Sequence, residues 1–138
     1  MNYALKHSIA YRLIKGANNV NKILNKKLNL YHIAIEQRAT LEIIKFESNV
    51  NQTTIANLLG KDKTTISRSL NSLEKKGLIK KSEILGDKRS NKIELTPEGE
   101  IILEKTINEI TSFREHLNTK LTDEEHDMFF KIIDKLEL

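Results

Sequence analysis

The feature that most constrains this sequence is a change of hydrophobic period at Leu78. Over residues 51–76, apolar residues recur every three or four positions, which is the spacing of amphipathic helices. From Leu78 onward the pattern changes to short alternating runs, which are typical of β-strands. Gly60, Gly77 and Gly86 separate these segments. The sequence therefore predicts two short helices, a tight turn between them, and a β-hairpin directly after the second helix.

Capping residues bound the two helices. Asn51 begins the first, because asparagine caps helix N-termini, and Gly60 ends it, because glycine adopts the left-handed backbone of helix C-termini. Asp62 caps the second helix, which we predict over residues 63–76. Apolar residues at spacings of four and three predict its buried face: Ile66, Leu70 and Leu73.

The opposite face of the 63–76 helix is polar and partly basic. It carries Thr64, Thr65, Arg68, Asn71, Ser72 and Lys75. Such side chains hydrogen-bond base edges and phosphates in the major groove of DNA, which is wide enough to admit a helix. Arg68 is the best candidate for a bidentate contact to guanine. We therefore expect this helix to be the recognition helix of a winged helix-turn-helix.

The hairpin supplies the wing. We predict strands over residues 78–84 and 91–95, joined by a polar loop over residues 85–90. Lys88 and Arg89 lie in that loop and can reach the minor groove, where the negative potential is strongest in narrow A·T tracts.

Amphipathic helices flank this core. The first is predicted from about Tyr3 to Leu28, and a partner subunit could cover its apolar seam. A second runs over residues 35–47. After the hairpin, Thr96 and Pro97 start another helix, and Thr122 starts the last one with a capping box. The predicted apolar seam of the first helix is Leu5, Ile9, Leu13, Ala17, Val20, Leu24 and Leu28. That of the helix after the hairpin is Leu103, Ile107, Ile110 and Leu117, and that of the last helix is Phe129, Ile132, Ile133 and Leu136.

Charge is unevenly distributed along the 138 residues. The net charge is +4, but residues 1–30 and residues 61–92 each carry +6, whereas residues 93–138 carry −7. A concentrated basic block favours a polyanionic partner, because Lys and Arg displace the counterions condensed on phosphates. The block over residues 61–92 contains the predicted recognition helix and wing, so double-stranded DNA is the expected partner.

Several functional classes are excluded by what the sequence lacks. There is no Cys, which excludes disulfides, thiolate zinc sites, iron–sulfur clusters and thiol-based redox sensing. No apolar run approaches the ~18 residues that span a bilayer, and no signal-peptide pattern is present, so we expect a cytoplasmic protein without a membrane partner.

Catalysis and metal binding find little support either. There is no Gly-x-Ser-x-Gly elbow and no glycine-rich phosphate loop, so we expect neither enzyme activity nor a cofactor. The four histidines lack metal-ligand spacing, and no metal site is predicted. These histidines are His7, His32, His116 and His126.

Five segments resemble the MarR family of bacterial transcription regulators. They are Asn51-Gln52-Thr53-Thr54-Ile55-Ala56, Lys63-Thr64-Thr65-Ile66-Ser67-Arg68, Leu73-Glu74-Lys75-Lys76-Gly77-Leu78-Ile79, Asp87-Lys88-Arg89-Ser90 and Leu95-Thr96-Pro97-Glu98-Gly99. The match is close over residues 50–103, and the flanking helices fit in length and order. Ala34 departs from the capping Thr that is usual before the second helix.

The resemblance implies a homodimer whose first helix and last two helices interlock. It also implies repression at a pseudo-palindromic operator, often relieved by a small-molecule effector that binds between the dimer and DNA-binding regions. Arg89 would be the wing arginine and Asp87 its salt-bridge partner. The set of residues predicted to contact DNA is Gln52, Thr53, Lys63, Thr64, Thr65, Ser67, Arg68, Asn71, Lys88, Arg89 and Ser90.

We therefore predict a mainly α winged helix-turn-helix protein that forms a single domain over residues 1–138. Its DNA-binding core spans residues 35–95 with the wing at 78–95, and its dimerisation helices lie in residues 1–30 and 97–138. Two alternatives stay open. One is a dimeric adaptor that uses the same fold to bind protein, against which the basic block argues. The other is an architectural DNA-binding protein, which would not outcompete bulk DNA by roughly a thousandfold.

Overall fold

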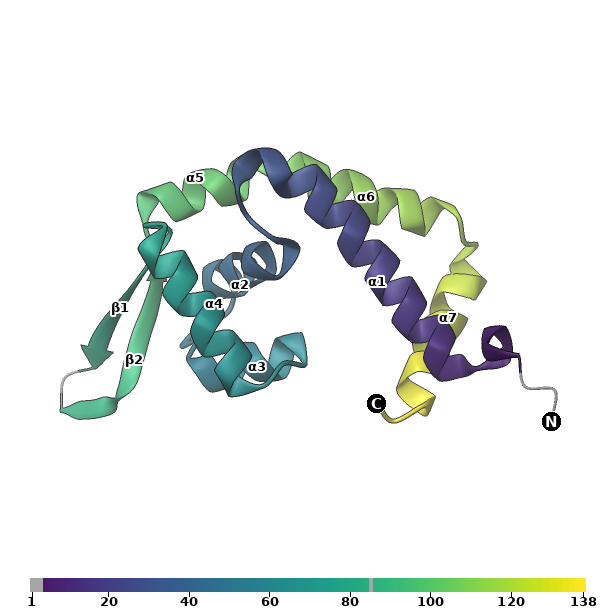
Figure 1. The fold of residues 1–138 in the computed structure, drawn as a ribbon, viewed down its shortest axis with the longest axis horizontal. Coiled ribbons are helices and arrows are strands. Elements are labelled where there is room, and N and C mark those ends of the chain that lie inside the picture. The colour runs from purple at the N-terminus through teal and green to yellow at the C-terminus, as the bar shows by residue number, and fades with distance from the viewer. Residues whose placement is uncertain (1–3, 85) are drawn as a thin grey trace. The chain divides into compact units, whose positions relative to one another are not determined.

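Helices and one antiparallel hairpin make up the part of the chain that the structure describes (Figure 1). The computed structural model describes residues 4–84 and 86–138, with only the backbone of residues 84 and 87–91. The elements in chain order are η1 (Leu5–His7), α1 (Ile9–Leu28), η2 (Asn29–Tyr31), α2 (Ile35–Phe46), α3 (Gln52–Leu59), α4 (Lys63–Lys75), β1 (Ile79–Ile84), β2 (Asp87–Leu95), α5 (Pro97–Lys105), α6 (Ile107–Thr119) and α7 (Asp123–Lys135). The predicted winged helix-turn-helix class is confirmed.

The chain forms two compact units, Met1–Thr106 and Ile107–Leu138. The first contains the helix-turn-helix and the hairpin, and the second contains α6 and α7. Within the described ranges, no helix combines the length and the hydropathy needed to cross a bilayer.

The core of the first unit lies among α2, α3, α4 and the base of the hairpin. The predicted apolar face of α4 is confirmed, since Ile66, Leu70 and Leu73 are at most 1% exposed. Burying a side chain of this size contributes roughly 1.5–3 kcal/mol. The other core side chains of these elements are Leu41, Ile55, Ala56, Leu78, Ile79 and Ile93.

The predicted caps around the turn are present. The Asn51 side chain accepts a hydrogen bond from the Thr54 N–H at 2.9 Å, and Asp62 accepts one from the Thr65 N–H at 2.7 Å. Gly60 has a φ of 64°, which only glycine adopts without strain, and it ends α3 as predicted. These local signals set the lengths of α3 and α4.

The helix α2 begins where predicted although Ala34 cannot cap it. The Ile35 N–H instead donates to Asn25 Oδ1 of α1 at 2.7 Å, and the Ala34 N–H donates to Gln37 Oε1 at 3.2 Å. A side chain from the preceding helix thus replaces the missing capping hydroxyl.

The first helix is shorter than predicted. It begins at Ile9, because Ser8 is extended and its hydroxyl accepts a hydrogen bond from the Tyr11 N–H at 3.2 Å, which caps the helix at this point. Of the predicted seam, Leu24 and Leu28 are buried, whereas Leu5 and Ile9 are more than half exposed.

The helix predicted from Pro97 is interrupted at Thr106, which separates α5 from α6. The Thr106 hydroxyl donates to the Ile102 carbonyl at 2.8 Å, a bond to the preceding turn that bends helices. Of the predicted seam, Leu103 and Ile110 are buried, whereas Ile107 and Leu117 are 49% and 43% exposed in the single chain. The buried residues of α5 are Gly99 and Leu103, those of α6 are Ile110 and Phe113, and Thr106 between the two helices is buried as well.

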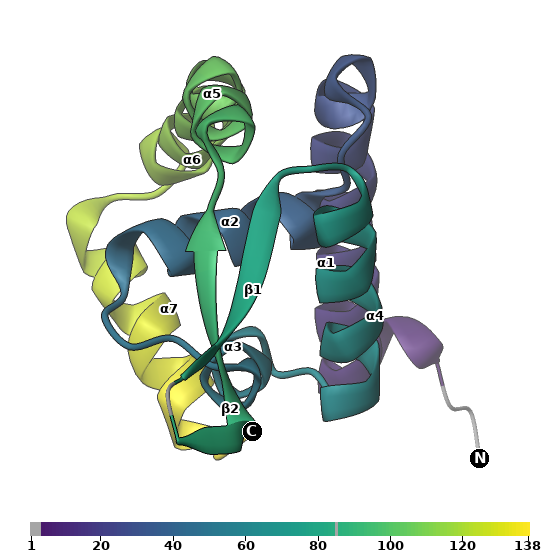
Figure 2. The ribbon, with the colours of Figure 1, turned by 90° about the vertical axis from the view of Figure 1, so that its left-hand side faces the viewer.

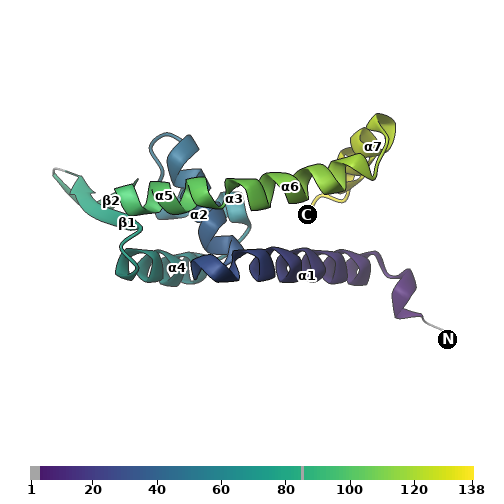
Figure 3. The same cartoon turned by 90° about the horizontal axis from the view of Figure 1, so that it is seen from above.

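The hairpin extends away from the helices of the first unit (Figure 3). Its strands pair in register from Ile79 with Leu95 to Glu83 with Asn91, and an irregularity follows between Glu83 and Ile84. Because β2 begins at Asp87, the predicted six-residue polar loop is too long. The irregularity absorbs the extra residues of β2 into the ladder, as β-bulges do, and polar side chains at such a position give no strand signal.

The second unit begins its last helix as predicted. The Thr122 hydroxyl accepts a hydrogen bond from the Glu125 N–H at 3.1 Å, and Glu125 Oε1 accepts one from the Thr122 N–H at 3.0 Å. This reciprocal capping box fixes the start of α7.

Candidate nucleic-acid interface

The outward face of α4 carries an exposed polar stripe. Thr64, Arg68, Asn71 and Lys75 are all exposed, and their spacing of four, three and four places them on one side of the helix. We call these four residues the α4 stripe. Three of them belong to the predicted DNA-contacting set, and Lys75 belongs to the predicted polar face. The stripe offers hydroxyl, amide, guanidinium and ammonium groups on a helix of a width that the major groove accepts.

Other predicted residues of this helix lie toward its flanks. Thr65 and Ser67 are half-buried. Ser72, also half-buried, accepts a hydrogen bond from Gln37 Nε2 of α2 at 3.1 Å. The same Gln37 accepts one from Lys76 Nζ at 3.0 Å, and Lys76 also donates to the His32 carbonyl at 2.8 Å. These contacts hold the C-terminal half of α4 against the start of α2.

The predicted DNA-contacting residues next to the turn differ in their exposure. Thr53 and Lys63 are exposed. Gln52 is half-buried, and its Nε2 donates to the Lys63 carbonyl at 2.8 Å. This bond joins the start of α3 to the first turn of α4.

The N-terminus of α4 has a defined electrostatic environment. The pKa of the Asp62 carboxyl is lowered below its ordinary value, chiefly by the hydrogen bond that it accepts from the backbone N–H of Thr65 and then by the Thr65 hydroxyl. The nearby positive charge of Arg68 lowers it further. The ionised form of Asp62 therefore stabilises the folded state.

This pKa predicts a pH dependence for the cap. A carboxyl whose folded-state pKa is lowered stabilises the fold at pH values above its unfolded value of 3.8, and the contribution is lost as the pH falls through the folded-state pKa. We expect Asp62→Asn, which still caps, to melt below the wild type at pH 6, and this difference to shrink as the pH falls toward 3.

Asp62→Ala serves as the control for this measurement, because it removes the cap at every pH. It is expected to melt below the wild type and below Asp62→Asn throughout the range. A wild type and Asp62→Asn whose melting temperatures differ by the same amount at pH 3 and pH 6 would contradict the assignment.

The wing contributes a second set of charges, at the base of the hairpin. Glu94 forms ion pairs with Lys92 at 2.7 Å and with Lys80 at 3.7 Å. Lys92 is the main cause of the lowered pKa of Glu94, and Glu94 in turn raises the pKa of Lys92. The backbone of residues 87–91 lies in β2, but the side chains of Asp87, Lys88, Arg89 and Ser90 lie outside the described part of the chain.

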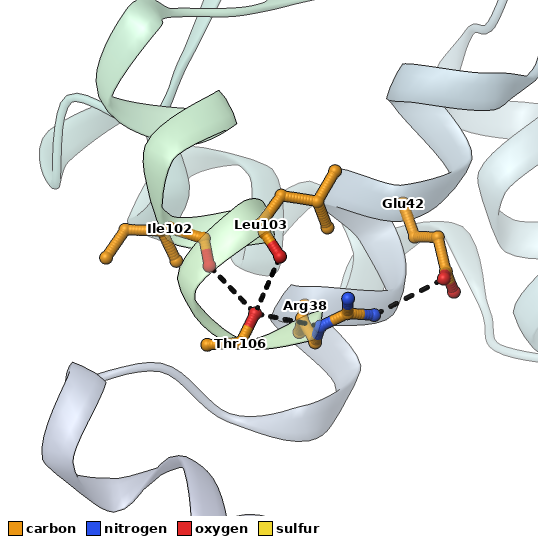
Figure 4. A network of polar contacts seen from close by, with 5 residues as sticks. All are labelled: Arg38, Glu42, Ile102, Leu103 and Thr106. Carbon is orange, nitrogen blue, oxygen red and sulfur yellow. Dashed lines mark hydrogen bonds and ion pairs between the residues drawn. The ribbon is translucent and has the colours of Figure 1, made fainter. Parts of the chain in front are cut away.

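A buried polar network joins α2 to the end of α5 (Figure 4). Arg38 is 2% exposed, and its Nε donates to the Thr106 hydroxyl at 2.9 Å while its Nη1 lies 3.4 Å from the Glu42 carboxylate. Thr106 itself is fully buried. No local sequence signal points to this pair, because the two residues are separated by 68 positions.

A cavity of about 630 Å³ borders the inner side of α4. Arg68 and Ser69 of α4 and Lys61 of the turn contribute to its wall. Lys61 lies 3.6 Å from Glu36, and the Ser69 hydroxyl is buried without a hydrogen-bond partner. The remaining lining residues are Asn21, Asn25, Ala34, Ile35, Glu36, Gln37, Ala39 and Leu59. Among the described residues, no three His, Asp or Glu side chains gather into a candidate metal site.

These elements define a winged helix-turn-helix protein: α3 and α4 joined by a capped turn, followed by a hairpin whose first strand contacts α4 (Figure 2). Residues 33–90 match the sequence model of the MarR family. An uncharacterized HTH-type transcriptional regulator of Bacillus cereus is 29% identical over 126 residues, which cover 91% of this chain and 84% of that relative.

Solved structures share the fold. The DNA complex of S. aureus MepR aligns with a TM-score of 0.87 at 24% identity, covering 94% of this chain and 96% of MepR. A MarR/EmrR family regulator from Acinetobacter sp. ADP1 aligns with a TM-score of 0.89 at 21% identity, covering 98% and 96%. The match to the MarR family model and the shared fold agree with the resemblance predicted from the sequence.

Proposed function

We propose that this protein is a cytoplasmic, sequence-specific DNA-binding repressor that acts as a homodimer on a pseudo-palindromic operator. The observation that carries the proposal is the α4 stripe, an exposed row of Thr64, Arg68, Asn71 and Lys75 on the helix of a winged helix-turn-helix that enters the major groove. The stripe lies within residues 61–92, which carry a net charge of +6. MepR, which shares the fold, was solved in complex with DNA.

The proposed dimer rests on apolar side chains that the single chain leaves exposed. On α7, Met128, Phe129, Phe130 and Ile132 are each about half exposed, and on α1 Ile9 is 64% exposed. Aromatic and aliphatic side chains at this density mark a protein–protein interface rather than a solvated surface. Two copies of α4 related by a two-fold axis would read the two halves of an operator.

The wing completes the proposed interface. We assign Lys88, Arg89 and Ser90 to contacts with the minor groove and adjacent phosphates, and Asp87 to the orientation of Arg89. The sequence supports this assignment, because these residues lie beside the turn of a hairpin that extends away from the helices.

A small-molecule effector fits the cavity on the inner side of α4. A molecule bound there would contact Arg68, which belongs to the α4 stripe, and would supply a partner for the buried Ser69 hydroxyl. Binding at this place would therefore change the surroundings of a residue that we propose contacts DNA.

The test is fluorescence anisotropy on DNA from upstream of the gene, with excess unrelated competitor DNA and at two salt concentrations. Arg68→Ala is expected to cost about 1–3 kcal/mol of binding free energy and to relax the base preference at one pair per half-site. The cause is the loss of a guanidinium that can bind guanine O6 and N7 together.

Lys120→Ala is the matched control, because it removes one positive charge from the turn after α6, outside the segment matched by the family. It should leave operator binding unchanged, and light scattering should give twice 15.9 kDa for each variant. If Arg68→Ala loses the same binding free energy on all DNA sequences, Arg68 contacts a phosphate rather than a base. Wild-type binding that competitor abolishes favours the architectural alternative, and no binding at low salt favours the protein-binding adaptor.

A further inference from the structure

The carboxamide of Asn71 in the α4 stripe is held by a side chain of the wing. Lys81 of β1 donates from Nζ to Asn71 Oδ1 at 2.6 Å. This distance is at the short end for an N–H···O bond, as is usual when the donor is charged. A lysine ammonium has three donors and no acceptor, so the carbonyl oxygen of Asn71, and not its NH₂ group, must face it.

Lys81 is itself fixed on two sides. It lies on β1 opposite Ile93, and its side chain is 22% exposed. Its ammonium lies 3.9 Å from Glu74 Oε1, and its backbone N–H donates to Glu74 Oε2 at 3.3 Å. Glu74 is one turn of α4 beyond Asn71. The ammonium therefore sits between two residues of the same helix, and strand pairing fixes the backbone that carries it.

This arrangement decides which end of the Asn71 side chain can meet DNA. Asparagine reads adenine by a bidentate contact, in which its carbonyl accepts from N6 and its NH₂ donates to N7. The ammonium of Lys81 occupies one of the two acceptor positions of the carbonyl oxygen, and its positive charge disfavours a second donor, such as the adenine N6 amino group, at the same oxygen. The NH₂ group of Asn71 stays available. The remaining NH₂ donates to acceptors. Guanine presents two acceptors in the major groove, O6 and N7, whereas adenine presents N7 beside the N6 amino donor.

We propose that Lys81 is a specificity-determining positioning residue: it orients Asn71 as a hydrogen-bond donor, so that the protein selects guanine over adenine at the base pair that Asn71 faces. The inference rests on the proposed DNA-binding function and adds to it which base class this position reads. Lys81 acts through Asn71 and needs no contact with DNA of its own.

The test selects preferred sites from a pool of randomised duplexes, using the full-length wild type and four variants. Asn71→Ala identifies the base pair concerned, because only there should its preference flatten. At that pair, Lys81→Met is expected to raise the affinity for adenine relative to guanine by about tenfold, which lies within the range that a bidentate contact discriminates. Lys81→Arg keeps a charged donor and should retain the wild-type preference.

Lys80→Met is the matched control. Lys80 precedes Lys81 on β1, is 65% exposed and pairs with Glu94, so its loss removes the same charge without touching Asn71. It should weaken binding on all sequences alike or leave it unchanged. Circular dichroism melting establishes that each variant folds. If Lys81→Met does not fold, Asn71→Asp replaces it, since a carboxylate cannot donate and should lose the guanine preference.

The outcomes separate the two proposals. A wild type that enriches no sequence overturns the proposed function and this inference with it. A wild type that enriches an operator, while Lys81→Met keeps its base preference or changes affinity on all sequences as Lys80→Met does, overturns the inference alone. A wild-type preference for adenine at the pair identified by Asn71→Ala also overturns it.

Discussion

Gly99→Ala is expected to destabilise the protein by about 3 kcal/mol, although alanine is a better helix former than glycine. Gly99 lies in the first turn of α5 and is buried. A Cβ at this position would overlap the carbonyl oxygen of Leu78 and lie 3.1 Å from its carbonyl carbon. The obstacle is backbone, so no rotation of a side chain can relieve it.

The Leu78 backbone cannot move aside without breaking other contacts. Its N–H donates to the Leu73 carbonyl at 3.0 Å in the C-terminal motif of α4, and its carbonyl accepts from the Thr96 N–H at 3.1 Å. The Thr96 hydroxyl also donates to the Gly77 carbonyl at 2.6 Å. An alanine at position 99 would push the start of α5 away from this junction and weaken these bonds.

Gly16→Ala is the matched control, because Gly16 lies inside α1 and an added Cβ meets no atom within 4 Å. This variant is expected to gain about 0.5–1 kcal/mol from helix propensity, the opposite sign to Gly99→Ala. Urea unfolding at one protein concentration measures both, since the stability of a dimer depends on concentration. Equal stability of Gly99→Ala and the wild type would mean that α5 does not pack on Leu78 in solution.

Sequence reasoning located the helix-turn-helix well because its signals are local. Asn51, Gly60 and Asp62 each act on backbone groups within five residues, so their effect is readable from spacing alone. The apolar face of α4 was equally readable, because Ile66 and its neighbours repeat at helical spacing and pack into one core.

The misses arise from contacts between residues far apart in the chain. No proline or glycine near Thr106 indicates the break between α5 and α6. The Thr106 hydroxyl, whose bond to the preceding turn bends the helix, also accepts a hydrogen bond from Arg38 of α2. A buried arginine runs against the usual exposure of that residue type.

The candidate site shows the same division. Residue type and spacing predicted that Arg68 and Asn71 share the outward face of α4, and the exposed stripe agrees with this expectation. The partner of Asn71 was not predicted, because Lys81 approaches it from a strand whose position depends on the Gly77 turn and on pairing with β2. The fold, and not the sequence motif, therefore decides which atoms of Asn71 are available for a contact with DNA.

Thr106→Val is expected to destabilise the protein by about 2–3 kcal/mol, although it changes one hydroxyl to a methyl group of similar size. The Thr106 oxygen accepts from Arg38 Nε at 2.9 Å, and both residues are buried. Valine leaves this donor of a buried guanidinium without that acceptor, and a hydrogen bond to a charged group contributes more than a neutral one. Urea unfolding and thermal melting both measure the loss.

Thr40→Val separates this effect from the general cost of replacing a buried threonine. Thr40 is also fully buried, and its hydroxyl also bonds the carbonyl four residues earlier, that of Glu36 at 2.9 Å. Because Glu36 keeps its helical hydrogen bond, the expected cost is about 1 kcal/mol or less. Equal losses in Thr40→Val and Thr106→Val would mean that the bond from Arg38 contributes nothing measurable.

The double variant Arg38→Met/Thr106→Val measures the coupling between the two residues, because it removes the donor and the acceptor together. Methionine keeps much of the buried bulk of Arg38, and Glu42, whose side chain is 29% exposed, can be hydrated when its partner is lost. The double variant is therefore expected to lose less stability than the sum of its single variants, by about 1 kcal/mol or more. Strict additivity would show that Arg38 and Thr106 contribute independently, and that the buried network between α2 and the end of α5 is not a coupled unit.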